Sequence, residues 1–302
     1  MDKIGIVIPI YKGSKYAKSL LQSIKTQSMK PHRILIIETD SNENIDTKNL
    51  KTDFEYFRIE SKEFNHGATR NKAAEILQDC EILVFITQDI MPYDNDWLLE
   101  LTKPIFNREA SMCYSKQIAH KGAGVIERVS RVANFEDEVV RKDITDVKNM
   151  GIKAFYCSNA SLAVFREDFH KVSGFPDNII VSEDWVLGER ILSQGGGIIY
   201  NPRSIIWHSH EFNFKRRFNR YFDLGVSMSY PSLSIYSVPF REIINTFLMQ
   251  CSYVLKNDKK IYLVELIADG IMRYIAMNLG KRHGLMPKWF KKLLSEQKYY
   301  WN

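Results

Sequence analysis

The stretch IGIVIPI at Ile4–Ile10 decides the fold class, because an uncharged run rich in β-branched residues is typical of a strand buried on both faces. Residues 16–27 follow with apolar side chains at helical spacing, and further apolar runs occur at residues 33–37 and Ile82–Ile86. Strands that alternate with helices predict an α/β protein with a Rossmann-like, mostly parallel sheet flanked by helices. Ligands bind at the carboxyl ends of the strands in such sheets.

The rest of the chain is less regular, and then becomes helical. Beyond about residue 240 the pattern predicts a helical C-terminal appendage. Further strands are expected at 54–59, 111–118, 155–165, 198–200 and 205–207, and further helices at 65–78, 97–106 and 181–192.

Composition places the chain among ordinary folded proteins. With 302 residues, 45% hydrophobic and 26% charged, it is no disordered, collagen-like or disulfide-scaffold protein. The N-terminal apolar run reads as a strand and not as a secretory signal, and the uncharged stretch 243–255 is too short to span a bilayer. We therefore expect a cytoplasmic protein. Four scattered cysteines fit buried thiols without a catalytic role: Cys80, Cys113, Cys157 and Cys251.

Two carboxylates follow apolar strands. Asp40 would accept hydrogen bonds from a base or ribose, although a cap or a solvated loop carboxylate explains its position better on spacing alone. Asp89 ends the sequence Thr87-Gln88-Asp89, where a carboxylate could bind a divalent cation or simply terminate the strand.

His208 and His210 alternate after another apolar strand, so that one of them would face the cleft. An HxH pair is more often structural than ligating. Together with Asp89, one such histidine would form a mixed oxygen and nitrogen site suited to Mn²⁺ or Mg²⁺ when phosphate completes it.

Glu183 and Asp184 form an acidic pair at a helix start. One of them could act as a general base toward a hydroxyl, and helix capping is the alternative. Arg70 lies in the first turn of a helix entered through His66 and Gly67, which would suit a phosphate or a sugar hydroxyl; a cap with a surface ion pair is the alternative.

The tail at residues 281–301 interleaves Lys and Arg with large aromatic rings. Such a segment can lie in a membrane interface held by anionic lipid, or be a solvated helix. No nucleic-acid module accompanies it, so nucleic acid is not expected as a partner.

Six ordered blocks, IVIPIY, FNHGATRN, FITQDIMP, CSNASLAVFR, SEDWVLGERIL and IIYNPRSIIWHSH, make the chain resemble a family 2 glycosyltransferase of the GT-A fold. The likeness is to the bacterial rhamnosyltransferase branch and covers about residues 4–210. It implies a nucleotide-sugar donor, a divalent metal and an inverting single displacement by an acceptor hydroxyl.

The resemblance also implies roles for particular residues. Pro9 and Tyr11 would shape the nucleobase pocket, Asp40 would bind the base, and Arg70 would lie near the sugar or phosphates. Gln88 would hold the middle position of the family's DxD motif, among the donor-binding residues, with Thr87 in place of its first Asp. Asp89 would ligate the metal together with His208 or His210, while Asp184 would be the base and Glu183 its support.

From this resemblance we expect transfer of L-rhamnose from dTDP-β-L-rhamnose to a surface polysaccharide or a lipid-linked saccharide. A UDP-hexose or UDP-amino sugar donor and a non-catalytic nucleotide-sugar- or lipid-binding protein are the alternatives. Residues 1–100 would bind the donor, 101–235 the acceptor, and 236–302 the inner face of the cell membrane or a second subunit of a homodimer.

Overall fold

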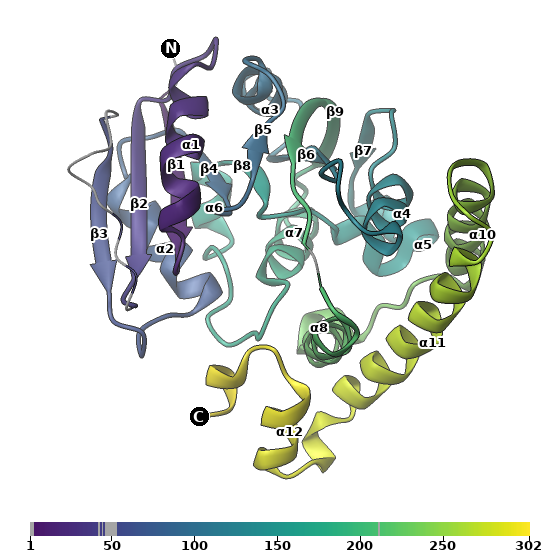
Figure 1. Ribbon diagram of the computed structural model, residues 1–302. Helices are drawn as coiled ribbons and strands as arrows, with labels where there is room; N and C mark the ends of the chain where they lie inside the picture. The colour runs from purple at the N-terminus through teal and green to yellow at the C-terminus, as the bar shows by residue number, and fades with distance from the viewer. Residues whose placement is uncertain (1–2, 42, 44, 46–52, 211) are drawn as a thin grey trace.

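The computed structural model describes residues 3–41, 43, 45, 53–210 and 212–302, and a nine-stranded sheet runs through the molecule (Figure 1). The strand order is β3-β2-β1-β4-β8-β6-β9-β5, with β7 paired to β9. The bounds are β1 Ile4–Ile10, β2 Arg33–Thr39, β3 Glu55–Ile59, β4 Ile82–Ile86, β5 Met91–Pro92, β6 Met112–Ile118, β7 Val140–Lys142, β8 Ser161–Phe165 and β9 Ile198–Trp207.

Strands β1 to β4 pair in parallel, as the N-terminal sequence predicts. Beyond β4 the sheet is mixed, because β8 runs antiparallel to both β4 and β6 while β9 returns parallel to β6. The expected α/β sheet flanked by helices is thus present, with its parallel pairing concentrated in the first half. The pairing of β4 with β1 ends at Val7, so Pro9, which has no N–H, removes no ladder hydrogen bond to β4.

Two strand predictions are wrong in detail. Residues 155–165 do not form one strand, since Gly151–Phe155 is a 3₁₀ helix and β8 begins only at Ser161. Conversely, residues 198–200 and 205–207 belong to one strand, β9, in which a register shift against Ser115 and Lys116 accommodates Pro202.

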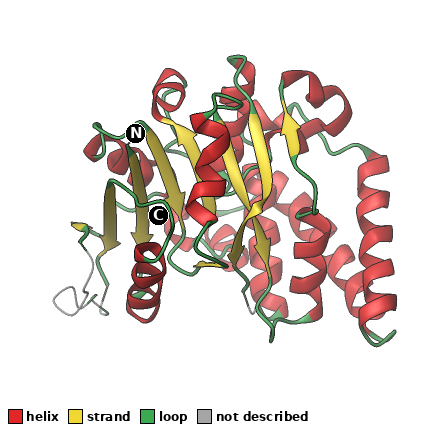
Figure 2. Cartoon of the chain, turned by 90° about the horizontal axis from the view of Figure 1, so that it is seen from above, coloured by secondary structure: helices red, strands yellow, loops and turns green. Residues whose placement is uncertain are grey.

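Helices cover both faces of the sheet (Figure 2). Along β1, Val7 faces a core with α2 and α7, whereas Ile6 and Ile8 face a second core with α1 and α3, as the two-residue period of a strand requires. The bounds are α1 Ser14–Lys25, α2 His66–Ile76, α3 Trp97–Phe106, α4 Val125–Asn134, α5 Val147–Met150, α6 Arg166–Lys171 and α7 Glu183–Ser193. As expected, Cys80, Cys113 and Cys157 are buried.

The C-terminal appendage is helical, as predicted, but helices begin earlier than residue 240. They are α8 Phe214–Ser227, α9 Pro231–Ser234, α10 Phe240–Asn257, α11 Tyr262–Lys281 and α12 Lys288–Leu294. Helices α8 and α11 pack closely where Gly225 and Gly280 meet, because a Cβ at Gly280 would lie 2.1 Å from the Phe222 carbonyl oxygen. The division of the chain at residues 100 and 235 stays a prediction.

The aromatic end of the tail packs onto the body. Trp301 is buried, Tyr300 donates its hydroxyl to the Asn178 carbonyl at 3.1 Å, and the Tyr299 ring lies 5.5 Å from that of Phe64. Among the aromatic residues of the tail at 281–301, all of them described, only Trp289 is largely exposed. Within the described ranges, no helix is both long enough and apolar enough to cross a membrane.

Candidate active site

The loops after β1 and β4 are joined by Gln88. Its Nε2 donates to the Tyr11 carbonyl at 3.0 Å, and its Oε1 accepts from the Tyr11 backbone N–H at 2.9 Å. The Tyr11 ring is left half-exposed at 48%. Gln88 therefore positions the Tyr11 loop, and the Tyr11 ring is available for stacking on a base.

Asp40 lies just past β2 on an exposed part of the surface. Its backbone N–H donates to the Ile59 carbonyl at 2.8 Å, and its carboxylate forms an ion pair with Arg58 on β3. The Arg58 guanidinium thus lies next to the carboxylate that we expect to bind a base. Part of the following polar cluster, residues 42, 44 and 46–52, lies outside the described residues.

Asp89, His208 and His210 come together after β4 and β9. The Oδ1 of Asp89 lies 3.6 Å from His208 Nε2, and its Oδ2 lies 3.4 Å from His210 Nδ1. One ligand atom from each residue lies within 4.8 Å of the others. The structure thus places Asp89 next to the HxH pair, and both histidines face the carboxylate, where the sequence predicts only one.

Hydrogen bonds fix the tautomer of His208. Its Nδ1 lies 2.8 Å from Gln117 Oε1, which also accepts from Arg131 Nη1 at 2.8 Å, while Gln117 Nε2 donates to Ser158 Oγ at 2.7 Å. His208 Nδ1 must therefore carry the proton, since Oε1 only accepts. Burial, together with the Arg131 charge, lowers the pKa of His208 and keeps the ring neutral.

This arrangement fits a divalent cation. The His208 Nε2 lone pair faces the Asp89 carboxylate, and two electron-rich atoms at that separation are stabilised by a cation bound to both. An imidazole that ligates a metal through one nitrogen commonly donates from the other, as His208 does to Gln117.

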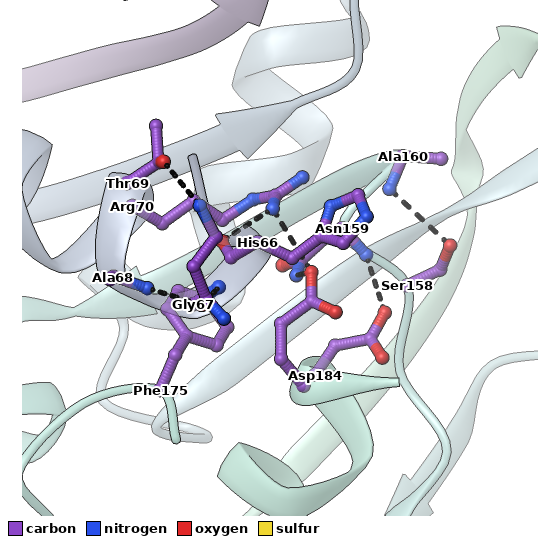
Figure 3. Close-up of polar contacts among 12 residues, drawn as sticks. His66, Gly67, Ala68, Thr69, Arg70, Ser158, Asn159, Ala160, Phe175 and Asp184 are labelled. Carbon is purple, nitrogen blue, oxygen red and sulfur yellow. Dashed lines mark hydrogen bonds and ion pairs between the residues drawn. The ribbon is translucent and has the colours of Figure 1, made fainter. Parts of the chain in front are cut away.

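Glu183 is held in a buried polar network at the start of α7. Its Oε1 accepts from Arg70 Nη1 at 3.0 Å and from Asn159 Nδ2 at 2.9 Å. Figure 3 shows Arg70 and Asn159 of this network together with Asp184. Burial raises the pKa of Glu183, but the Arg70 charge, with His66 and the hydrogen bonds, outweighs burial and lowers it. Glu183 is therefore a carboxylate that orients Arg70 and Asn159.

Asp184 has a different environment. Its Oδ2 accepts from the Asn159 backbone N–H at 2.9 Å and its Oδ1 from the Trp185 N–H at 3.0 Å. Burial and the neighbouring Glu183 charge raise the pKa of Asp184 to about 7. A carboxylate with such a pKa is suited to accept a proton from a hydroxyl near neutral pH.

Local backbone features hold the acidic pair in place. Ser182 caps α7 in the left-handed conformation with φ of 65°, a conformation that costs a non-glycine residue energy and often marks functional sites. On α2, Asn65 caps the first turn by accepting from Gly67 and Ala68, which sets the direction of Arg70. Gly67 permits close contact, since a Cβ there would lie 2.0 Å from the Pro176 carbonyl oxygen.

Several buried polar atoms around this network lack a hydrogen-bond partner within the described part of the chain. They are His66 Nε2, Arg70 Nε, Thr87 Oγ1 and Asn159 Oδ1. Buried polar atoms are nearly always paired in folded proteins, so such a group of atoms indicates a site for a polar ligand.

A cavity of about 1080 Å³ extends from the acidic pair toward the C-terminal helices. Asp184 and His210 both line it, together with Trp185, Tyr156 and Arg220. Arg220 lies on α8, where its guanidinium stacks on Phe212 at 4.9 Å, and no carboxylate pairs with it in the described residues. The cavity is large enough for a saccharide.

Fold and site, with the family match given next, define a glycosyltransferase of the GT-A type. The chain belongs to glycosyl transferase family 2, whose family model matches residues 5–172.

Two curated relatives match almost the whole chain. It is 28% identical to the O-antigen chain rhamnosyltransferase RfbN of Salmonella typhimurium, covering 99% of this chain and 96% of that protein. It is also 28% identical to the O-antigen chain rhamnosyltransferase WbaN of Salmonella anatum, covering 100% and 96%. The family assignment makes the protein a glycosyltransferase.

Solved structures share the fold. The mannosyltransferase PcManGT from Pyrobaculum calidifontis, in complex with GDP-Man and Mn²⁺, matches with a TM-score of 0.60 at 13% identity, covering 94% of this chain and 87% of that one. S. aureus TarS 1–349 in complex with UDP-GlcNAc gives 0.56 at 12% identity, covering 97% and 84%. At these identities the likeness concerns the fold alone.

Three contributors to the site were missed in the sequence. Gln117 of β6 bonds to His208, Arg131 of α4 donates to Gln117, and Arg220 of α8 lines the cavity. Gln117 is 91 residues from His208, so no local pattern links the two. Arg220 alone of the three lies close in the sequence to a recognised motif, because it follows the HxH pair shortly.

Proposed function

We propose that the protein transfers L-rhamnose from dTDP-β-L-rhamnose, with inversion, to a hydroxyl of a surface polysaccharide or lipid-linked saccharide precursor. Asp184 accepts the proton of the acceptor hydroxyl as its oxygen bonds to the anomeric carbon, and the bond from that carbon to the nucleoside diphosphate breaks. The observation that carries this proposal is the half-buried Asp184, whose raised pKa of about 7 suits a base, at the wall of the cavity.

Asp89, His208 and His210 would hold a divalent cation, Mn²⁺ or Mg²⁺. Such an ion would neutralise charge on the departing diphosphate. Arg220 adds a positive charge on the same side of the cavity, and Arg70 lies near the donor, oriented by Glu183 at 3.0 Å.

The donor half uses the β1 and β4 loops. Pro9 and Tyr11 bound the nucleobase pocket, Gln88 holds the Tyr11 loop, and Asp40 binds the base. The printed names of the two curated relatives support rhamnose as the sugar. A UDP-hexose or UDP-amino sugar remains the second candidate, because the fold is shared with proteins that bind other nucleotide sugars.

Calorimetric titration of dTDP and UDP, each with and without Mn²⁺ or Mg²⁺, tests this assignment. We expect tighter binding of dTDP, and a further gain when the metal is present. Preference for UDP would replace the rhamnose assignment by the second candidate, and failure to bind either nucleotide would overturn the proposed donor class.

A further inference from the structure

Helices α10 and α11 expose an apolar face over most of their length, at one edge of the molecule (Figure 1). On α11 the opposite side already packs inward through Leu266, Met272 and Ala276. A helix with a single buried stripe normally carries polar residues on its outer side. We call the following exposed residues the outer face: Phe240, Ile243, Ile244, Phe247, Leu248, Leu255, Val264, Ile267, Ile271, Tyr274 and Ile275.

In residues 236–302 the acidic side chains pair with the body of the protein, whereas most of the basic side chains are exposed. Residues 236–302 contain eleven Lys and Arg and five Asp and Glu, a net +6 that equals the formal net charge of +6 of the whole chain. All five acids form ion pairs with cations of residues 128–217: Glu242 with Lys153, Asp258 with Arg128, Glu265 and Asp269 with Arg217, and Glu296 with Arg216. The acids are therefore neutralised on the inner side.

The cations of the same helices remain exposed. Lys256, Lys259 and Lys260 surround the turn between α10 and α11, where Leu255 and Ile261 are also exposed. Arg241, Lys281 and Arg282 lie near the other ends of the two helices. In the described residues none of these six side chains has a carboxylate partner, so the outer face is bordered by positive charge alone.

We propose that the outer face docks on an anionic lipid surface, with its apolar residues in the interfacial layer and the bordering cations against lipid headgroups. An apolar helix face with flanking Lys and Arg binds in this way. A second copy of the chain is the less favoured occupant, because self-association through this face would bring two sets of unpaired cations together.

The inner sides of the same helices face the cavity of the candidate active site. Glu242 of α10 and Glu265 and Arg273 of α11 line the cavity that Asp184 also lines. Docking would hold that cavity beside the lipid surface, within reach of a saccharide carried on a lipid. This last step rests on the proposed function, whereas the docking itself does not.

Co-sedimentation of the full chain with vesicles tests the proposal. We expect binding to vesicles of phosphatidylcholine with phosphatidylglycerol, and binding about tenfold or more weaker to phosphatidylcholine alone or in high salt. Two double variants, Ile267→Glu with Ile271→Glu and Lys259→Glu with Lys260→Glu, should each lose binding. Lys15→Glu with Lys18→Glu, the same charge change on α1 at the other side of the molecule, should keep it.

Three results would overturn the proposal: no binding to the anionic vesicles, unchanged binding of both outer-face variants, or a stable dimer in sedimentation equilibrium that Ile267→Glu with Ile271→Glu dissociates. Nucleotide titration of every variant shows that it is folded. If the wild type binds lipid but neither dTDP nor UDP, the proposed function fails and the docking stands.

Discussion

Gln88 and Tyr11 hold each other through two reciprocal hydrogen bonds, from Gln88 Nε2 to the Tyr11 carbonyl at 3.0 Å and from the Tyr11 N–H to Gln88 Oε1 at 2.9 Å. The Gln88 side-chain amide thus joins the loops that follow β1 and β4, as a pair of backbone hydrogen bonds would. Because both polar groups of the side chain are used, a residue without them releases the Tyr11 loop.

We expect Gln88→Leu to weaken nucleotide binding about tenfold, since each lost hydrogen bond contributes roughly 0.5–1.5 kcal/mol to the positioning of the loop. Calorimetric titration of dTDP measures the change. Gln78→Leu, the same replacement at an exposed position, is the matched control and should bind as the wild type does. Unaltered affinity of Gln88→Leu would show that the loop is held by other contacts.

Asp184→Asn should reduce transfer by about 10³-fold and leave nucleotide affinity nearly unchanged, because the amide cannot take the proton of the acceptor hydroxyl. Rates from product formation and dissociation constants from calorimetry separate the two effects. Glu183→Gln is the informative neighbour, since it removes the charge paired with Arg70 at 3.0 Å and should weaken donor binding as well. An equal loss of transfer and nucleotide affinity in Asp184→Asn would refute the role of Asp184 as base.

The pH dependence of the rate follows from the same carboxyl. Burial and the Glu183 charge raise the pKa of Asp184 to about 7, and a base works only when deprotonated. The transfer rate should therefore rise with pH up to about 7 and level off above it.

The stability of the fold should move in the opposite direction. The pKa of Asp184 in the folded protein lies above the value of 3.8 that it has in the unfolded chain. The contribution of Asp184 to stability is therefore present below pH 3.8 and is lost as the pH rises toward 7. Melting temperatures of wild type and Asp184→Asn should thus diverge between pH 4 and pH 8, with the variant the more stable at pH 8. Parallel melting curves would contradict the raised pKa.

Metal binding should depend on Gln117 as well as on the three candidate ligands. Gln117→Leu removes the group that accepts the proton of His208 Nδ1–H. The ring is then no longer held with the lone pair of Nε2 facing Asp89, and Mn²⁺ affinity should fall about 10- to 100-fold. Asp89→Ala should abolish specific Mn²⁺ binding, and a chelator should abolish transfer until Mn²⁺ is returned. Titration of Mn²⁺ gives the affinities, with Gln117→Glu, which keeps an acceptor, as control. Full activity in chelator would exclude a metal role.

The sequence predicts a helix or strand correctly where the residues of that segment alone determine its structure. The strand Ile82–Ile86 and the helix Trp97–Phe106 have the expected bounds, and Asp89 meets the HxH pair because both follow strands of one sheet. The antiparallel entry of β8 was not predictable, since strand direction depends on how the chain returns between β6 and β8 and not on the residues of β8.

The contributions of the backbone to the site were also not predictable from the sequence. Asn159 holds Asp184 through its peptide N–H, a group that every residue except proline possesses, and Ser182 acts through its φ of 65°. The amide of Asn159 reaches Glu183 across 24 residues, so that its partner appears only when the chain is folded. Side-chain type alone thus points to Glu183 and Asp184 but not to what distinguishes their pKa values.

The close packing of α8 on α11 allows a last prediction, on stability. Gly280→Ala would place a Cβ 2.1 Å from the Phe222 carbonyl oxygen and 2.8 Å from the Val226 nitrogen, so the helices must separate, at a cost of about 1–3 kcal/mol. Gly270→Ala, on the same helix with no atom within 4 Å of the new Cβ, should instead stabilise by up to about 1 kcal/mol through helix propensity. Scanning calorimetry should show the two melting temperatures moving in opposite directions from the wild type. If Gly280→Ala melts no earlier than Gly270→Ala, the contact between α8 and α11 is looser than the structure has it. Because α8 also carries Arg220, separation of the helices should weaken nucleotide binding in Gly280→Ala and not in Gly270→Ala.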